Sequence, residues 1–358
     1  MQPPRPEGQP EIRIDLYSDT STLPTPEMRD YMCRAEVGDE QKGEDPTVNE
    51  LQDMVAELLG KEAAVFLPSG TMCNQIAFAV HCNPGDLVLV DRSAHPLISE
   101  SGGTAVMASC TLYPIDGERG QYTPEQMQQI MDAATRYWPG ISGISVEQTT
   151  NRPGGFIWPL EQMRAVCGFA REQRAFTHMD GARLLNAVVA TGIPATEYTA
   201  TFDSVWIDLS KGLGAPVGGV LAGSSDFIGE AWQWKQRIGG AMRQAGIVAA
   251  AGVYALRNNV ERMAEDHANA KILARGIATA PGIAIDPEAV QSNMVRFDIS
   301  ALDTLARDFA ARLHQETGVR VSAPGRHLIR AIPHLGISEA QVREAATAIT
   351  ALATELHR

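Results

Sequence analysis

Two stretches of the sequence are the most informative about the fold: Thr177-His178-Met179-Asp180-Gly181-Ala182-Arg183 and Leu209-Ser210-Lys211-Gly212-Leu213-Gly214. Each closes a short apolar run that is typical of a buried strand. The first run ends on an acid, Asp180, and the second leads to a lysine, Lys211. We therefore expect an aspartate and a lysine at the ends of two nearby strands.

The pattern around these stretches is an alternation of short β-rich runs with longer helical segments. It favours an α/β fold in which helices cover both faces of a mainly parallel sheet. The candidate strands are 63–67, 87–90, 105–107, 143–147, 175–179, 205–209 and 219–222. The clearest helical segments are 71–81, 124–136 and 160–172. Together they predict one doubly wound domain of about 240 residues.

The rest of the chain predicts a second, smaller domain. An Ala-rich helical run over 247–278 leads into it, and a capping box at Ser338-Glu339-Ala340-Gln341 begins a closing helix. The polar, Pro-rich start of the chain is typical of a flexible tail. We predict a tail over 1–13, a large domain over 14–250 and a small domain over 251–358, with a linker helix from about residue 247.

Composition excludes several classes of function. A net charge of −13, with dispersed basic residues, argues against nucleic acid. No apolar run reaches the roughly 18 residues of a membrane span. The cysteines have neither a CxxC pair nor metal-ligand spacing, so we expect reduced thiols in a cytoplasmic protein and name no metal. They are Cys33, Cys73, Cys82, Cys110 and Cys167.

Lys211 is unusual because lysine is rarely buried without a partner or a chemical role. Burial lowers the pKa of a lysine amine toward its neutral, nucleophilic form. The alternative is a surface lysine in a Gly-rich turn. With Asp180 upstream, the pair fits pyridoxal phosphate (PLP), which needs a lysine for its Schiff base and an acid that keeps its pyridine nitrogen protonated. We therefore predict PLP as the cofactor.

Two further motifs suit the other groups of such a site. Pro68-Ser69-Gly70-Thr71 lies where a strand ends and a helix begins, so its N–H groups and hydroxyls could hold a phosphate. The alternative is that Ser69 only caps the helix. Arg183 follows Asp180 by three residues, and arginine can bind an amino-acid carboxylate through two parallel hydrogen bonds. The alternative is an ion pair between Asp180 and Arg183.

With its other motifs, the chain resembles the low-specificity L-threonine aldolases, within the β-eliminating lyase group of fold-type I PLP-dependent enzymes. The matching stretches follow the family order from residue 15 to the C-terminus. Besides the motifs already quoted, they are Ser18-Asp19-Thr20, Gly43-Glu44-Asp45-Pro46-Thr47-Val48-Asn49, Ala94-His95, Glu100-Ser101-Gly102-Gly103 and Gly239-Gly240-Ala241-Met242-Arg243-Gln244. The resemblance implies an aspartate aminotransferase-like large domain with a seven-stranded sheet and a smaller α+β C-terminal domain.

The resemblance also implies a role for each site residue. Lys211 would carry the cofactor, Asp180 would bind its pyridine nitrogen, and His95 would stack on its ring and move a proton at the β-substituent. The implied cofactor-binding residues are Ser69, Gly70, Thr71, His95, Asp180, Arg183, Ser210, Lys211 and, across a subunit boundary, Arg243. The implied substrate-binding residues are Ser18, Lys42, Thr150, Arg183 and Arg330.

Lys42 and Thr150 depart from the family pattern. Lys42 stands where the family commonly has a tyrosine, and Thr150 stands where it commonly has a histidine. A threonine hydroxyl can hydrogen-bond a substrate but is no base near neutral pH. These two positions therefore bear on the recognition of the β-substituent and on the reaction itself.

The resemblance implies a lyase that cleaves the Cα–Cβ bond of a β-hydroxy-α-amino acid such as threonine, which gives glycine and an aldehyde. Because of Lys42 and Thr150, a PLP-dependent β-eliminating lyase, racemase or aminotransferase is the alternative. A non-catalytic PLP-fold protein that binds a partner is a third reading. The resemblance also implies a homotetramer, a dimer of dimers, with active sites at subunit interfaces.

Overall fold

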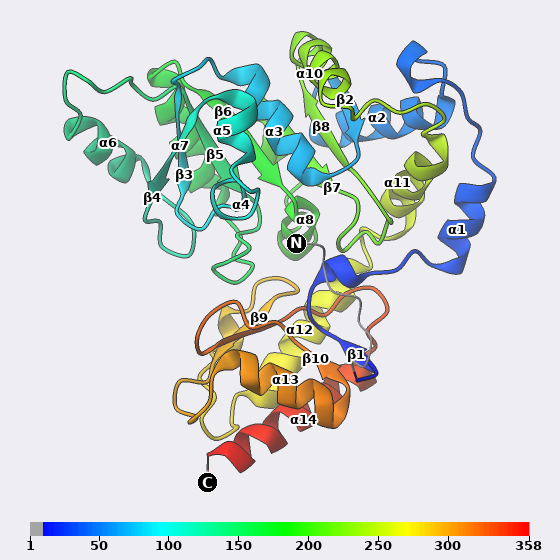
Figure 1. Cartoon of the computed structure of the whole chain (residues 1–358), viewed down its shortest axis with the longest axis vertical. Coiled ribbons are helices and arrows are strands. Elements are labelled where there is room, and N and C mark those ends of the chain that lie inside the picture. Colours follow the sequence, from blue (N-terminus) through cyan, green and yellow to red (C-terminus); the bar gives the residue numbers. More distant parts are fainter. Residues whose placement is uncertain (1–9, 358) are drawn as a thin grey trace. The chain divides into compact units, whose positions relative to one another are not determined.

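The computed structural model describes residues 10–357, so most of the predicted tail, residues 1–9, lies outside the described residues (Figure 1). The chain divides into two compact units. One is Thr22–Met263, and the other joins the segment up to Ser21 with the segment from Ala264. The predicted domains, 14–250 and 251–358, stay a prediction.

A seven-stranded sheet forms the centre of the Thr22–Met263 unit, in the order β2-β8-β7-β6-β5-β3-β4. Strands β3 to β7 pair in parallel, and β8 runs antiparallel to both of its neighbours. The mainly parallel seven-stranded sheet is therefore confirmed. The strands are β2 (Ala63–Leu67), β3 (Leu87–Asp91), β4 (Thr111–Ile115), β5 (Gly143–Glu147), β6 (Phe176–Gly181), β7 (Ser204–Asp208) and β8 (Gly219–Gly223).

Helices cover both faces of this sheet. Side chains alternate along a strand, and Val65 of β2 packs in one core with α3 and α10 while Phe66 packs in another with α2 and α7. The helices of this unit are α1 (Pro26–Cys33), η2 (Glu40–Lys42), α2 (Pro46–Leu59), α3 (Gly70–His81), α4 (His95–Ile98), α5 (Gly103–Ala108), α6 (Pro124–Asp132), α7 (Leu160–Glu172), α8 (Leu184–Thr191), α9 (Ala195–Thr199), α10 (Ser225–Arg237) and α11 (Gly246–Asn258).

One predicted strand is wrong. Residues 105–107 lie inside helix α5, and the strand at that side of the sheet is β4, which the sequence did not predict. A run of three apolar residues carries too little periodicity to separate helix from strand. The Ala-rich run over 247–278 is also two helices rather than one, because α11 ends at Asn258 and α12 begins at Met263.

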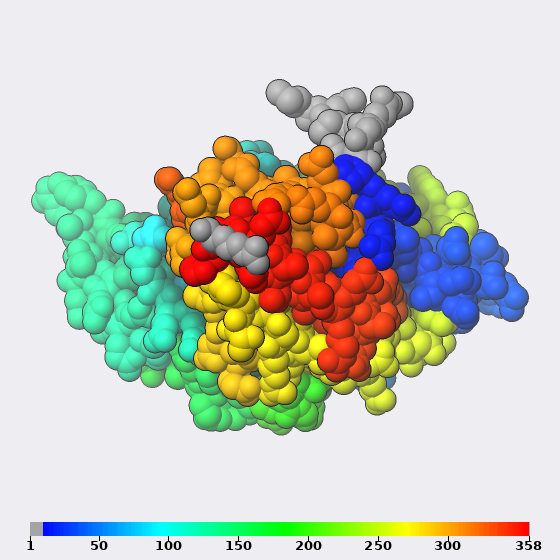
Figure 2. Space-filling view, turned by 90° about the horizontal axis from the view of Figure 1, so that it is seen from below, coloured from blue at the N-terminus to red at the C-terminus, as the bar shows by residue number. Residues whose placement is uncertain are grey.

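The second unit has an α+β composition and its own core. Strand β1 (Ile14–Asp15) pairs in parallel with β10 (Val319–Arg320), and β9 (Val295–Asp298) pairs antiparallel with β11 (Leu328–Ala331). Its helices are η1 (Asp19–Ser21), α12 (Met263–Ile277), η3 (Pro287–Ala289), α13 (Ala306–Thr317) and α14 (Glu339–Leu356). Helices α13 and α14 contact each other, and both lie in the part of the chain coloured orange to red in Figure 2. The capping box at Ser338 is confirmed.

Within residues 10–357, we find no helix with the length and apolar character that a bilayer crossing requires.

Candidate active site

The candidate site lies at the carboxyl ends of neighbouring parallel strands, where open α/β sheets place their ligand sites. In the register of the sheet, Glu147 of β5 lies opposite Asp180 of β6, and Asp180 lies opposite Trp206 of β7. The chain after β7 leads at once to Lys211. Residues 181–183, 207–208 and 212–213 line one small hollow, so the chain segments on either side of Lys211 lie beside the segment that follows Asp180.

Asp180 is buried, with 1% of its surface exposed, and its carboxylate is held from two sides. The Ala182 N–H donates to Oδ1 at 3.1 Å, and the Asn74 amide Nδ2 donates to Oδ2 at 2.9 Å. These donors compensate for the loss of water around a buried carboxylate. Sequence alone predicted Asp180 but not Asn74.

His95 begins the short helix α4 and is paired with a buried acid. Its Nδ1 lies 2.9 Å from Oε1 of Glu100, which also accepts from Asn74 at 2.8 Å. The hydrogen bond to Glu100 raises the pKa of His95, and burial raises the pKa of Glu100. One ligand atom each of His95, Glu100 and Asp180 lies within 4.8 Å of the others. The Asn74 amide group donates to both acids, so this cluster is arranged for hydrogen bonding rather than for a cation.

Lys211 is mostly buried, with 18% of its side chain exposed, and it has an acid as its partner. Its Nζ lies 2.7 Å from Oδ2 of Asp208, the last residue of β7, and 5.5 Å from the centre of the Trp206 ring. The N–H and hydroxyl of Ser210 both donate to the other oxygen of Asp208. Lys211 is therefore partly buried beside Asp208, and the Ser210 hydroxyl donates to Asp208.

Ser69 caps helix α3, and its hydroxyl accepts from the Met72 N–H at 3.2 Å. Gly70 follows it against the Trp206 ring, where an added Cβ would lie 2.2 Å from a ring carbon. The N–H groups of the first turn of a helix have no partner within the helix and favour an anion. With Thr71, this turn forms a cradle that suits a phosphate.

Glu147 and Arg183 border the same region. Glu147 is buried, and burial raises the pKa of its carboxyl to about 8, with a further contribution from the negative charge of Asp180. The guanidinium of Arg183 acts in the opposite direction on that pKa. Arg183 is itself 5% exposed, and its N–H donates to the carbonyl of Gln148.

Lys42 and Arg243 lie on two segments that an ion pair and hydrogen bonds hold together. Lys42 is exposed at the end of η2, and Arg243 Nη1 pairs with Asp39 Oδ2 at 3.0 Å. Beneath them, Glu40 accepts from the Met242 N–H and pairs with Lys235 at 2.9 Å. Neither side chain of this Glu40–Lys235 pair is exposed, so the pair fixes the position of the two segments relative to each other.

Thr150 is buried near the start of the loop that follows β5, and its hydroxyl lies 3.4 Å from the carbonyl of Phe156. The other two predicted substrate residues belong to the second compact unit. There the Ser18 hydroxyl accepts from Thr20, and Arg330 of β11 donates from Nε to the Ser322 hydroxyl at 3.2 Å.

Sequence reasoning missed four polar partners at the site. Glu100 begins a motif that the sequence singled out, and Glu147 ends a predicted strand, so both acids gave a usable signal. Asp208 precedes Lys211 by three residues, and Asn74 follows Thr71 by the same interval. Nothing in a single sequence distinguishes that spacing from chance.

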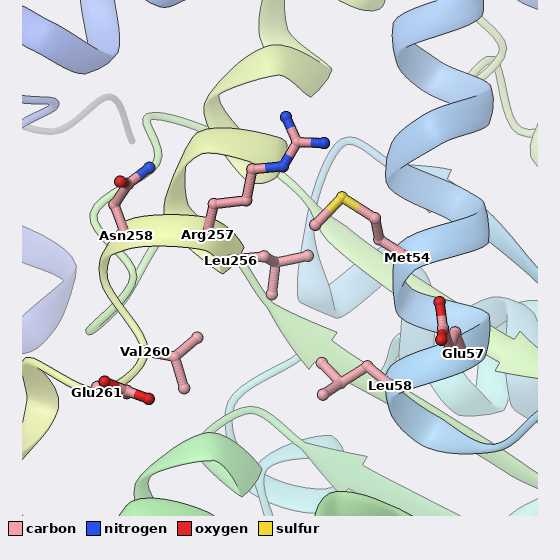
Figure 3. Close-up of a pocket in the computed structure, with 8 residues that line it drawn as sticks. All are labelled: Met54, Glu57, Leu58, Leu256, Arg257, Asn258, Val260 and Glu261. Atoms are coloured by element: carbon pink, nitrogen blue, oxygen red, sulfur yellow. The ribbon is translucent and has the colours of Figure 1, made fainter.

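A larger hollow of about 540 Å³ lies between α2 and α11 (Figure 3). Its lining is mainly apolar, with Met54 and Leu58 facing Leu256 and Val260. None of the predicted site residues lines it.

Comparisons with known proteins agree with this geometry. Residues 15–300 match the family described as β-eliminating lyase, whose members are PLP-dependent. The chain is 40% identical over 336 residues to the low-specificity L-threonine aldolase of Escherichia coli K12, covering 93% of this chain and 97% of that one. It is 36% identical to low-specificity L-threonine aldolase 1 of Arabidopsis thaliana, covering 92% and 93%.

A solved structure of Leishmania major threonine aldolase has the same fold, with a TM-score of 0.80 at 18% identity, over 95% of this chain and 99% of that one. The fold-type I architecture that the sequence predicted is therefore confirmed. Because the family match covers most of the chain and the relatives are similar over nearly all of it, this chain is a lyase that belongs to the β-eliminating lyase family, in the group of the low-specificity L-threonine aldolases.

Proposed function

We propose that this chain is a PLP-dependent aldolase that cleaves the Cα–Cβ bond of a threonine-like β-hydroxy-α-amino acid to glycine and an aldehyde. One observation carries the proposal: a buried aspartate, a lysine paired with an acid, and a histidine paired with an acid gather at adjoining strand ends. These residues are Asp180, Lys211 and His95. The relatives named for this activity support it.

The chemistry of the donor set fits PLP. The first turn of α3 offers N–H groups to a phosphate. At Gly70 the Trp206 ring leaves no room for a Cβ. Asp180 offers a buried carboxylate to a pyridinium N–H, and Lys211 offers an amine. We propose that Ser69, Gly70, Thr71, Ser210 and Arg243 hold the phosphate. PLP, when bound, supplies an electron sink for the charge left on Cα as a bond to that carbon breaks.

His95 is the proposed base at the β-hydroxyl. Glu100 holds Nδ1, so Nε2 is the ring nitrogen that would take the hydroxyl proton. The same contact fixes the plane of the imidazole. Lys211 would offer Nζ to the cofactor, and Asp208 lies at hydrogen-bond distance to orient that amine.

We propose that the substrate carboxylate is bound by Ser18, Arg183 and Arg330. A guanidinium suits this task because its planar fork can donate two charge-assisted hydrogen bonds to one carboxylate. Lys42 and Thr150 are proposed to contact the β-substituent. A lysine there favours side chains that carry an acceptor or a negative charge.

We further propose a cytoplasmic homotetramer with active sites at subunit interfaces. The free state of the five cysteines supports a reducing compartment. The exposure of Lys42 and Arg243 supports a contribution of both to the site of a neighbouring subunit.

The test is a product assay on purified protein with PLP. With L-threonine, L-allo-threonine and phenylserine we expect glycine and the matching aldehyde in equal amounts, and no activity from Lys211→Ala. Keto acid without glycine would contradict the aldolase proposal and would favour β-elimination or transamination. Loss of substrate chirality without either product would favour racemisation.

A further inference from the structure

A chain of buried hydrogen bonds connects the Asp180 carboxylate with the interior of the sheet. Asn74 Oδ1 lies 3.1 Å from Nε2 of His178, and Nδ1 of the same ring lies 2.8 Å from the Ser204 hydroxyl. That hydroxyl lies 2.8 Å from Nε2 of His81. Asn74, His178 and Ser204 are each fully buried, so water does not compete for these contacts.

The indole of Trp206 determines which atom donates in each of these hydrogen bonds. The indole N–H of Trp206 can only donate, and it lies 2.7 Å from Asn74 Oδ1, so this atom is the carbonyl oxygen of the amide. His178 must then donate from Nε2. Burial lowers the pKa of His178 to about 3 and that of His81 to about 4, so both rings are neutral. Nδ1 of His178 therefore accepts from Ser204, which accepts from His81.

The result is that both amide hydrogens of Asn74 point at acids. One is donated to Asp180 at 2.9 Å and the other to Glu100 at 2.8 Å. Each of these acids has an oxygen within 4.8 Å of the other, so their charges repel. If the amide were turned over, its oxygen would face both carboxylates. The donors from Trp206 and His178 prevent this.

We propose that Asn74 is the positioning residue for the two acids of the site, Asp180 and Glu100, and that Trp206 and His178 set the orientation of its amide. By orienting Asp180, Asn74 would position the acid that faces the cofactor ring. By orienting Glu100, it would position His95. The proposal rests on the proposed function, because it takes Asp180 as the partner of the pyridine nitrogen.

The first test is Asn74→Asp in the holoenzyme. The new side chain keeps an oxygen for Trp206 and His178 but turns a second oxygen toward the two acids. We expect the dissociation constant of PLP to rise at least about tenfold, as for the loss of one hydrogen bond to a charged group. We also expect the visible absorption maximum of bound PLP to move to shorter wavelength as the ring nitrogen loses its proton, and kcat to fall more than KM rises.

The matched control is Asn269→Asp, a buried asparagine of the second unit whose amide donates to the carbonyl of Ile337. It introduces a buried acid that has no hydrogen bond to Asp180, Glu100 or His95, so PLP affinity should stay within about twofold. A purely structural role of Asn74 would lower thermal stability in both variants and leave the absorption band in place. PLP binding by Asn74→Asp within about twofold of the parent would overturn the proposal.

A second measurement does not depend on a variant. Nitrogen-15 NMR of histidine-labelled holoenzyme should show His178 as the neutral Nε2–H tautomer from about pH 5.5 to about pH 8.5. A Nδ1–H tautomer or a protonated ring would overturn the assigned direction. The two proposals fail differently: parent protein that binds no PLP contradicts the proposed function, whereas an unaffected Asn74→Asp enzyme contradicts only the role of Asn74.

Discussion

Three buried acids at the candidate site have different partners. Asp180 receives two N–H donors, and Glu100 receives an amide and an imidazole. Glu147 ends the neighbouring strand, and burial raises the pKa of its carboxyl to about 8. Glu147 therefore holds its proton near neutral pH, whereas hydrogen-bond donors stabilise the carboxylates of Asp180 and Glu100.

The pairing of His95 with Glu100 predicts the acidic limb of the pH profile. The hydrogen bond to Glu100 raises the pKa of His95, and a base must be neutral, so kcat/KM should rise with pH through that pKa. In Glu100→Gln the pKa of His95 falls, and the limb should move by about one unit to lower pH. Profiles from about pH 5 to about pH 9 measure this. An exposed counterpart, Glu172→Gln, should leave the limb in place, and an unmoved limb in Glu100→Gln would remove His95 as the base.

Glu147 predicts a pH dependence of stability. Its folded pKa, about 8, lies above the ordinary value, so the folded state binds the proton more tightly. Stability contributed by this group is present at low pH and is lost as pH rises toward 8. Glu147→Gln removes the titration, so its unfolding free energy relative to the parent should increase by on the order of 1 to 3 kcal/mol between pH 5 and pH 8. Urea unfolding at both pH values checks this, and a constant difference would contradict it.

Single residues show which parts of the site could be predicted from the sequence. Lys211 and Asp180 were predictable because each closes an apolar run, which is a local signal. Asn74 and Trp206 act through contacts with residues far away in the chain, and an asparagine in a helix carries no local mark of that. The hydroxyls of Ser69 and Ser210 also have local partners that the sequence did not predict.

Among the secondary-structure elements, buried strands were the most predictable. Strand β2, at one edge of the sheet, and the inner strand β5 both match their predicted bounds because all or nearly all of their residues are buried. Strand β4, at the other edge, was missed because it is partly exposed and contains Pro114. Helix α5 was taken for a strand because its apolar run is short. The apolar pattern therefore predicts the buried strands of this sheet better than the partly exposed one.

The N-terminal turn of α3 depends on the absence of a side chain at Gly70. In Gly70→Ala a Cβ would lie 2.2 Å from the Trp206 ring, which is itself nearly fully buried. We expect a loss of about 1 to 3 kcal/mol in stability and weaker binding of PLP, because the indole must shift. Thermal unfolding and PLP titration measure both.

Gly168 of α7 gives the matched control for that change. A Cβ at Gly168 would meet no atom within 4 Å, so Gly168→Ala should stabilise the protein by about 0.5 to 1 kcal/mol through helix propensity. Equal effects of the two substitutions would contradict the role given to Gly70.

For the whole molecule, the proposed assembly predicts a mass in solution of four times the 38.6 kDa chain. It also predicts complementation between subunits. Lys211→Ala and Arg243→Ala should each be inactive, but subunits exchanged between them should regain about a quarter of parental activity, because one site in each mixed dimer is intact. Light scattering and the activity of the exchanged sample are the measurements. A mixture no more active than its parents would place Arg243 in the site of its own subunit.

We propose Lys211 as the residue to which PLP is attached. Borohydride reduction of the holoenzyme, followed by digestion and mass spectrometry, tests this attachment. We expect one modified lysine per chain, Lys211, and no modification elsewhere in Lys211→Ala. Modification of a different lysine, or of none in protein that is saturated with PLP, would rule out Lys211 as the attachment point.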